Sequence, residues 1–442
     1  MRILFVIDTY DTNNNGTSIS AQRFAAELRR RGHEVRILCA DPQGMDSDGK
    51  PLPVEDTQKY IVKEFYTPFF NPLIKKHGFT FGTIFKESRQ VIHEAVQWAD
   101  IIHSFMPFGL EMYASKYAEK LGKPNTGAFH IQPENMWSSV GLGKVQWIQE
   151  RGYRGFRNWH YYKFRHIHVP SQFMGQMLEE RGYTAKIHVI SNGIQDAFMQ
   201  AGKKKADCGR PPKLPEYHDK IVIMMIGRLS QEKRQDVIIN AVPYSKYADK
   251  IQLIFAGKGP EYENYVELGQ SLKNAPQYVY VEQKELIDLL LQCYLYVHAS
   301  DMESEAISCI EAFATGLVPV IANSEVSATP QFALDGRSLF KPGSPKDLAR
   351  AIDYWLDHPK ERQEMEELYR VSAKQYSLAN SVARFEEMLL EEIADNEKKS
   401  GKIRNKLIAT FLLLPIWLNA QSPEGVQYNA DKSVTFFYNN SF

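Results

Sequence analysis

Two glutamates, Glu303 and Glu311, stand eight residues apart in the segment ESEAISCIE. We expect the first in a loop and the second about one and a half turns into the following helix. Between them, the backbone amides near Ala306 and Ile307 form a helix N-terminus, whose unpaired N–H groups suit a phosphate. Carboxylates on either side can accept hydrogen bonds from sugar hydroxyls. The alternative is an acidic helix start with one surface glutamate.

Two cations follow an apolar strand expected at 221–226. In the loop GRLSQEK, Arg228 leaves the strand and Lys233 comes five residues later. A planar guanidinium and a compact ammonium can together hold a diphosphate.

Near the N-terminus, Gly16 lies in a polar loop where the absence of a side chain lets the backbone approach a ligand closely. Taken alone, the GRLSQEK segment also fits a solvated loop, and a single glycine does not define a site.

These loops belong to two series of alternating strands and helices. In the first, the apolar run 3–7 is followed by a helical pattern at 21–31 and a strand at 35–40; the second has strands at 221–226, 252–256, 294–299 and 318–322, with helices near 235–241 and 306–315. The pattern predicts an α/β fold of two doubly wound, Rossmann-like domains facing across a cleft, with ligands beyond the carboxyl ends of the strands.

The expected domain boundaries follow from composition. We expect an N-terminal domain at 1–200, a proline-containing linker at 201–218, and a nucleotide-sugar-binding domain at 219–375. An amphipathic helix at 376–400 is expected to pack back on the N-terminal domain. The remaining residues, 401–442, begin with basic residues and a short apolar run, and we interpret them as an appended tail that is either signal-like or membrane-associating.

Composition excludes several classes of protein. The 442 residues include 53 Lys+Arg and 53 Asp+Glu, and this zero net charge argues against a nucleic-acid partner. The four cysteines form no Cys-x-x-Cys pair, so neither a zinc site nor a disulfide framework is expected. Neither a Gly-x-Gly-x-x-Gly nor a Walker motif supports use of a nicotinamide cofactor or ATP. The strand-like start at 1–8 leaves no signal peptide there and predicts a cytoplasmic protein.

Taken together, the motifs resemble those of GT-B retaining glycosyltransferases of family 4, including diacylglycerol and ceramide glycosyltransferases. The resemblance runs from residue 1 to about 395 and rests on DTYDTNNNGTSISAQRFAAELRRRGH at 8–33, VISNGI at 189–194, GRLSQEKRQDVIINA at 227–241, GKGP at 257–260 and ESEAISCIEAFATGLVPVIA at 303–322. It implies a GT-B fold and transfer of a hexose, with retention of configuration, from a nucleotide diphosphate sugar to a hydroxyl. We favour UDP-glucose or UDP-galactose as donor, without a metal or cofactor.

The resemblance also implies roles for individual residues. Arg228 and Lys233 match the pair that holds the donor diphosphate, and Gly16 matches the glycine whose amide approaches it. Glu303 matches the residue that contacts the donor-sugar hydroxyls, and Glu311 the one that contacts the ribose.

Further residues complete the expected site. The start of the helix, at Ala306 and Ile307, is expected to bind the donor. His130, in TGAFHIQPEN, matches a histidine near the donor sugar and joins the catalytic set of Arg228, Lys233 and Glu303, with a buried core histidine as the alternative. Many family members have Glu-Ser-Phe-Gly where this chain has ESEA. Ala306 therefore replaces a glycine, and Glu305 adds a negative charge beside the expected phosphate site, which leaves the donor's identity open.

The acceptor is less well marked. Seven aromatic residues occur at 65–85, and aromatic residues alternate with arginines and a lysine at 147–165. Such a composition suits an anionic membrane interface and a lipid acceptor of the diacylglycerol or ceramide type, with the protein peripheral on the inner face of the cell membrane. The alternative is that the rings are core and the cations cover one solvated face. The candidate acceptor or membrane residues are Phe69, Phe70, Trp147, Arg154, Arg157 and Trp159.

Three other functions remain open from the sequence. A glycosyltransferase that extends a polysaccharide or glycan predicts activity on soluble acceptors and no vesicle binding. A nucleotide-sugar epimerase predicts donor turnover without an acceptor. A non-catalytic nucleotide-sugar-binding protein predicts binding without turnover.

Overall fold

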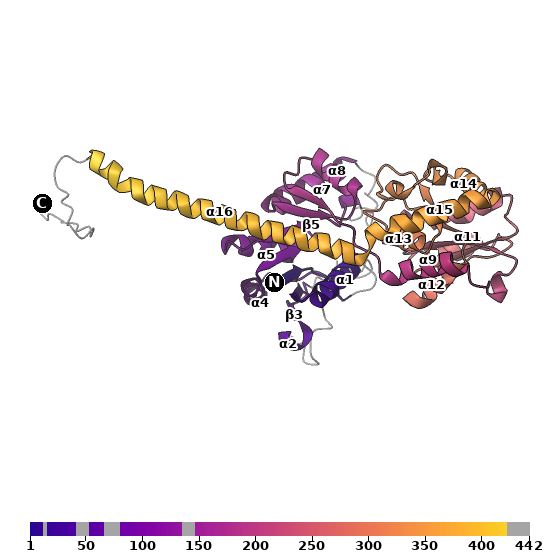
Figure 1. Cartoon of the computed structure of the whole chain (residues 1–442), viewed down its shortest axis with the longest axis horizontal. Coiled ribbons are helices and arrows are strands. Elements are labelled where there is room, and N and C mark those ends of the chain that lie inside the picture. The colour runs from indigo at the N-terminus through magenta and orange to yellow at the C-terminus, as the bar shows by residue number, and fades with distance from the viewer. Residues whose placement is uncertain (12–15, 41–52, 66–79, 135–145, 422–442) are drawn as a thin grey trace, which may run out of the picture.

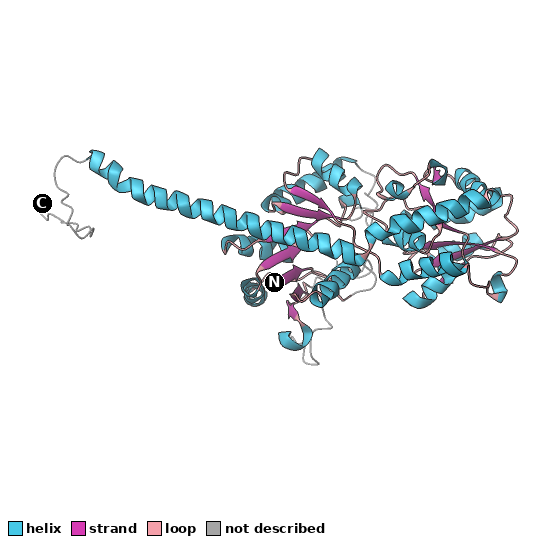
Figure 2. Ribbon diagram, viewed as in Figure 1, coloured by secondary structure: helices cyan, strands magenta, loops and turns pink. Residues whose placement is uncertain are grey.

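The computed structural model describes residues 1–11, 16–40, 53–65, 80–134 and 146–421, with side chains described as far as residue 399, apart from residues 56 and 146. Two α/β domains lie end to end, each with a parallel sheet between layers of helices (Figures 1 and 2). The prediction of two doubly wound domains is confirmed.

The N-terminal sheet has seven strands in the order β3-β2-β1-β4-β5-β6-β7. Its direction of winding reverses between β1 and β4, and loops that leave a sheet at such a reversal diverge and leave room for a ligand. The strands are β1 (Arg2–Val6), β2 (Glu34–Cys39), β3 (Lys59–Ile61), β4 (Ile101–Ser104), β5 (Asn125–Ala128), β6 (His166–Val169) and β7 (Lys186–Val189). The helices are α1 (Gly16–Arg30), α2 (Val54–Thr57), α4 (Lys86–Trp98), α5 (Gly109–Lys120), α7 (Gln146–Trp159) and α8 (Gln172–Glu180).

The C-terminal sheet has six strands in the order β10-β9-β8-β11-β12-β13, and its reversal lies between β8 and β11. The two cation- and acid-bearing loops singled out from the sequence follow these two strands. The strands are β8 (Ile221–Ile226), β9 (Ile251–Ala256), β10 (Gln277–Val279), β11 (Leu295–His298), β12 (Val318–Ala322) and β13 (Leu339–Phe340). The helices are α9 (Asp196–Cys208), α10 (Gln235–Ala241), α11 (Tyr262–Gly269), α12 (Gln283–Gln292), α13 (Ile307–Ala314), α14 (Pro345–Asp357) and α15 (Pro359–Ser372).

The last helix, α16 (Leu378–Gln421), returns to the N-terminal domain and runs along it and beyond it (Figure 1). Apolar side chains at helical spacing bury one face of α16 in the same core as β1 and α1: Val382, Phe385, Met388 and Leu389. The ring of Phe385 meets Phe5 edge-on at 5.9 Å and Phe24 at 5.2 Å between ring centroids. This part of α16 is therefore an integral helix of the N-terminal domain.

Two segments differ from the expected boundaries. Helix α9 extends to Cys208 and packs on α12, α13 and α15, so the first part of the expected linker at 201–218 is a helix of the C-terminal domain. Helix α16 continues through residue 421, so the expected tail begins as unbroken helix, and 422–442 lie outside the described residues. Among the helices with described side chains, none is long and apolar enough to cross a membrane.

Candidate active site

The loop after β8 is held by close backbone contacts with the loop after β9. Leu229 N–H donates to the carbonyl of Lys258 at 3.1 Å. A Cβ on Gly257 would lie 2.1 Å from the carbonyl oxygen of Gly227, and one on Gly259 would lie 2.1 Å from that of Leu229. The GKGP segment is therefore glycine-rich because no side chain fits between the two loops.

Lys233 and Glu303 form an ion pair at the reversal point of the C-terminal sheet. Lys233 ends the short 3₁₀ turn Gln231–Lys233 after β8, and Glu303 lies in the loop after β11. The Lys233 Nζ donates to Glu303 Oε1 at 2.5 Å, and His298 Nε2 lies 2.9 Å from the same oxygen. Burial opposes ionisation of Glu303, but the charge of Lys233 and the hydrogen bond from His298 outweigh it and lower the pKa of that carboxyl. Glu303 is therefore a carboxylate across the neutral pH range.

The helix that follows Glu303 begins at a strained residue. Ala306 has φ 72° and ψ 65°, in the left-handed region, and α13 starts at the next residue, Ile307. A Cβ is disfavoured in that conformation, which explains why glycine suits this position in the family pattern. The amides at the start of α13 are directed out of the helix end, as expected from the sequence.

Glu305 turns toward the N-terminal domain. Its Oε2 accepts hydrogen bonds from the backbone N–H of Asn192 at 3.0 Å and from Asn192 Nδ2 at 2.6 Å. One residue earlier, the carbonyl of Ser304 accepts a hydrogen bond from Ser171 Oγ at 2.6 Å. Burial raises the pKa of Glu305 to about 7, although its hydrogen bonds act in the opposite direction. The ESEA segment thus joins the two domains.

Glu311 also meets the opposite domain. Its Oε1 accepts a hydrogen bond from the Arg23 guanidinium of α1 at 3.2 Å. Burial raises the pKa of Glu311, and the charge of Arg23 partly offsets this. Gly16 is the first residue of the same helix α1, and a Cβ built on it meets no atom of the described residues within 4 Å. Those residues therefore leave room for a ligand to approach the Gly16 backbone closely.

His130 lies just beyond β5 in the N-terminal domain. It is 6% exposed, stacks on Phe105 and packs edge-on to His168. Its Nε2 finds no hydrogen-bond partner among the described residues. Burial, followed by the proximity of His168, lowers the pKa of His130, so its ring is neutral. By contrast, His103 is fully buried and its Nδ1 lies 2.8 Å from Thr126 Oγ1, which suits a structural role.

The aromatic and basic residues at 147–165 divide between core and surface. Tyr153, Tyr161 and Phe164 are buried, whereas Trp147 and Trp159 are 66% and 70% exposed. The exposed side of α7 carries residues at the spacing of one helical face: Trp147, Arg151, Arg154 and Asn158, with Trp159 adjacent.

A groove of about 650 Å³ adjoins that face, lined by Tyr153, Arg154, Arg157 and Arg181 together with Glu150 and Glu180. Arg157 is partly held in place, because its Nη1 donates to the carbonyl of Arg181 at 2.7 Å. Phe69 and Phe70 lie outside the described residues.

The structure thus brings together residues from both halves of the predicted site. Lys233 and Glu303 are in contact, Arg228 directly follows Gly227, and the Lys233 side chain passes 3.9 Å from a Cβ built on Gly227. The sequence did not identify His298 as the partner of Glu303, Arg23 as the partner of Glu311, or Asn192 as the partner of Glu305. Arg23 and Asn192 lie within the segments 8–33 and 189–194 that carry the resemblance, and this was the only signal for them.

Two family models match the chain. The model described as Glycosyltransferase Family 4 matches residues 14–198, and the model described as Glycosyl transferases group 1 matches residues 210–370. The first covers most of the N-terminal domain and the second covers most of the C-terminal domain.

Individual proteins match over most of the chain. The alpha-monoglucosyldiacylglycerol synthase of Streptococcus pneumoniae is 24% identical over 439 residues, covering 94% of this chain and 92% of that protein. The GDP-mannose-dependent alpha-mannosyltransferase of Mycobacterium tuberculosis is 23% identical over 344 residues, covering 73% of this chain and 79% of that protein. Among solved structures, Anabaena Alr3699/HepE in complex with UDP superposes with a TM-score of 0.65 at 17% identity, covering 88% of this chain and all of that one. The last likeness is one of fold.

Proposed function

The chain belongs to the GT-B glycosyltransferases of family 4, and from this premise we propose that it is a retaining hexosyltransferase that moves glucose or galactose from a UDP-sugar to a membrane lipid. The observation that carries the donor half of the proposal is the Lys233–Glu303 pair at the reversal point between β8 and β11. A cation that offsets a diphosphate and an acid that binds sugar hydroxyls must lie within one donor's length of each other, and these two are in contact.

The proposed step breaks the bond between the sugar C1 and the diphosphate oxygen and forms a bond from the acceptor oxygen to C1 on the same face. Negative charge grows on the departing diphosphate, where Arg228, Lys233 and the start of α13 stabilise it. The acceptor hydroxyl gives its proton to a departing phosphate oxygen, so UDP leaves with that proton. No enzyme nucleophile is required.

The remaining donor contacts are assigned in the same way. Glu303 receives hydrogen bonds from the sugar hydroxyls, and the neutral ring of His130, whose Nε2 has no partner within the described part of the chain, is assigned to the donor sugar. Glu311 and the Gly16 amide are assigned to the ribose and the diphosphate. Because Arg23 holds Glu311 and lies on the α1 helix that Gly16 begins, the two domains contribute jointly to this end of the donor.

A lipid acceptor is supported by a relative and by a surface. The name of the S. pneumoniae relative specifies a glucosyldiacylglycerol product with an α linkage. The exposed face of α7 has tryptophans near both ends and Arg151 and Arg154 between them. Indole rings favour the headgroup region of a bilayer, and arginines attract anionic headgroups. We therefore place α7 on the inner face of the cell membrane, with the protein bound peripherally.

The experiment that tests this function supplies the full chain with UDP-glucose, UDP-galactose, UDP-N-acetylglucosamine and GDP-mannose, each with a total lipid extract. Mass spectrometry detects added hexose, and NMR of the product gives the anomeric configuration. An α-hexosyl lipid from a UDP-hexose is expected. Three results would contradict the lipid-transferase proposal. Transfer only to soluble glycans would indicate a glycan-extending transferase, and donor turnover without an acceptor would indicate an epimerase. Donor binding without turnover would indicate a non-catalytic binding protein.

A further inference from the structure

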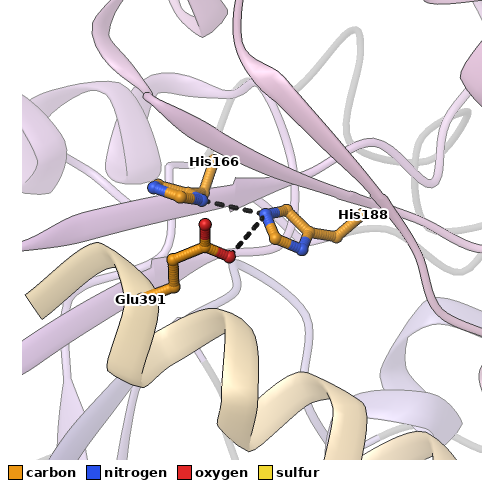
Figure 3. A group of neighbouring side chains, drawn as sticks. All are labelled: His166, His188 and Glu391. Carbon is orange, nitrogen blue, oxygen red and sulfur yellow. Dashed lines mark hydrogen bonds and ion pairs between the residues drawn. The ribbon is translucent and has the colours of Figure 1, made fainter. Parts of the chain in front are cut away.

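Three side chains that the proposed transfer does not use meet where α16 crosses strands β6 and β7. His166 begins β6, His188 lies on β7 and Glu391 lies on α16, and all three point toward one another (Figure 3). Each offers one ligand atom, and the three atoms lie within 4.8 Å of one another. We propose that they bind a divalent transition-metal ion that fastens α16 to the N-terminal sheet.

The donor atoms suit such an ion. Two imidazole nitrogens and one carboxylate oxygen are a ligand set that Zn²⁺ accepts, with water in the fourth position. His166 Nδ1 lies 2.8 Å from His188 Nε2, and His188 Nε2 lies 3.9 Å from Glu391 Oε2. With bonds of about 2.0–2.1 Å, tetrahedral ligand atoms stand roughly 3.3 Å apart, so these two distances lie about half an ångström from the ideal, one shorter and one longer. The Glu391 side chain is 38% exposed, which leaves room for the water.

Neighbouring groups orient the ligands. The other ring nitrogen of His166, Nε2, lies 3.3 Å from Asp395 Oδ2 and 3.7 Å from Glu392 Oε2. Carboxylates there favour a proton on Nε2 and leave the Nδ1 lone pair facing His188, as is common for metal-bound histidines. Lys186 Nζ donates to Glu391 Oε1 at 2.5 Å, which turns the other oxygen, Oε2, toward the rings.

The cluster is separate from the donor site. His166 stands at the amino end of β6, whereas Ser171, beyond the carboxyl end of that strand, contacts Ser304 in the donor loop. An ion at this position ties helix α16 to strands β6 and β7. The ion therefore stabilises the packing of α16 on the sheet and takes no part in sugar transfer.

Zinc binding to the full chain tests the proposal, by equilibrium dialysis against Zn²⁺ followed by elemental analysis. The test variants are His188→Ala and Glu391→Gln, and the matched control is His218→Ala, which removes a surface histidine beside Asp219. The wild type and His218→Ala are expected to bind one equivalent, and both test variants to bind at least about tenfold more weakly. Bound Zn²⁺ is also expected to raise the Tm of the wild type but not that of His188→Ala.

Two results would overturn the proposal: folded wild-type protein that binds no zinc, or His188→Ala and Glu391→Gln that bind it as tightly as the wild type. Circular dichroism establishes that each variant is folded. Glu391→Gln alters a partly exposed side chain and so keeps the test valid if His188→Ala does not fold. Replacement of Zn²⁺ by Co²⁺ supplies a second readout, because tetrahedral coordination gives a far more intense d–d absorption band than octahedral binding through surface oxygens.

Discussion

The Lys233 ammonium lies 2.5 Å from a carboxylate oxygen of Glu303, so the cation assigned to the diphosphate and the acid assigned to the sugar form one ion pair. The two residues come from different loops, seventy positions apart, and meet because β8 and β11 are neighbours in the sheet. The Nε2 atom of His298 lies 2.9 Å from the same oxygen of Glu303 and helps to fix the position of the carboxylate. Before the donor binds, the ion pair keeps the side chains of Lys233 and Glu303 in position. A donor that enters the site replaces this ion pair with its own contacts.

Replacement of Arg228 tests the proposed stabilisation of the leaving group. We expect Arg228→Ala to lower kcat by a factor on the order of 100, because a fixed cation stabilises charge that develops in the transition state. Steady-state kinetics with UDP-hexose measures this. Arg350→Ala, which removes an exposed arginine paired with Asp347 on α14, is the control and should retain wild-type turnover. Turnover of Arg228→Ala close to that of the control contradicts the role.

Ala306 offers a test of backbone strain. Ala306→Gly should raise the free energy of unfolding by about 0.5–1 kcal/mol, because glycine adopts positive φ without a clash. Ala312→Gly, at a buried position within the same helix, should lower it by about 1 kcal/mol. Thermal or urea unfolding of both variants makes the comparison. Equal destabilisation by the two changes would show that the left-handed conformation at residue 306 carries no cost.

Glu305 makes stability depend on pH. Its pKa is raised from 4.5 to about 7 in the folded protein, so the folded state binds more protons than the unfolded state between these values. Stability from this group is therefore fully present below about pH 4.5 and is lost as pH rises through 7.

Glu305→Gln keeps the side chain neutral and removes that loss. Relative to the wild type, the variant should become more stable by up to about 3 kcal/mol between pH 5 and pH 8. Urea unfolding at several pH values measures the difference. Glu325→Gln, at an exposed position, is the control and should follow the wild type. A difference between Glu305→Gln and the wild type that does not change with pH would exclude the proposed titration.

The exposed face of α7 gives a prediction for membrane binding. The double variant Arg151→Glu/Arg154→Glu should bind vesicles containing anionic lipid at least about tenfold more weakly, since each basic residue near the surface contributes about 1 kcal/mol. Sedimentation with vesicles at low salt measures this, with Arg350→Glu on the other domain as control. Turnover with a short-chain, water-dispersed acceptor should be unaffected. Vesicle binding that survives the double change would remove α7 from the membrane interface.

Much of the fold was predictable from local patterns. The run Ile221–Ile226 is continuous and apolar, as buried parallel strands are, and the structure forms β8 over the same residues. The helix predicted at 235–241 is α10 with the same bounds. Helix α1 begins at Gly16, earlier than the start predicted at residue 21. The sequence missed this first turn because it is polar and lacks the apolar spacing that marks a helix.

Contacts between distant segments were not predictable in this way. Arg23 reaches Glu311 across 288 positions, and Asn192 reaches Glu305 across 113, through the packing of two separate domains. The charge of Glu305 suggested a place beside the phosphate, whereas the structure joins its carboxyl to Asn192. Similarly, the aromatic residues at 147–165 could be sorted into core and surface only once the orientation of α7 was known.

The central claim is that Lys233 holds the nucleotide diphosphate, and calorimetric binding of UDP and of uridine tests it most directly. Wild-type protein should bind UDP far more tightly than uridine, and Lys233→Ala should lose most of that difference while its affinity for uridine stays the same. Glu303→Gln, which leaves the lysine charge in place, should keep the difference. If Lys233→Ala binds UDP as tightly as the wild type does, the diphosphate lies elsewhere and the proposed site is wrong.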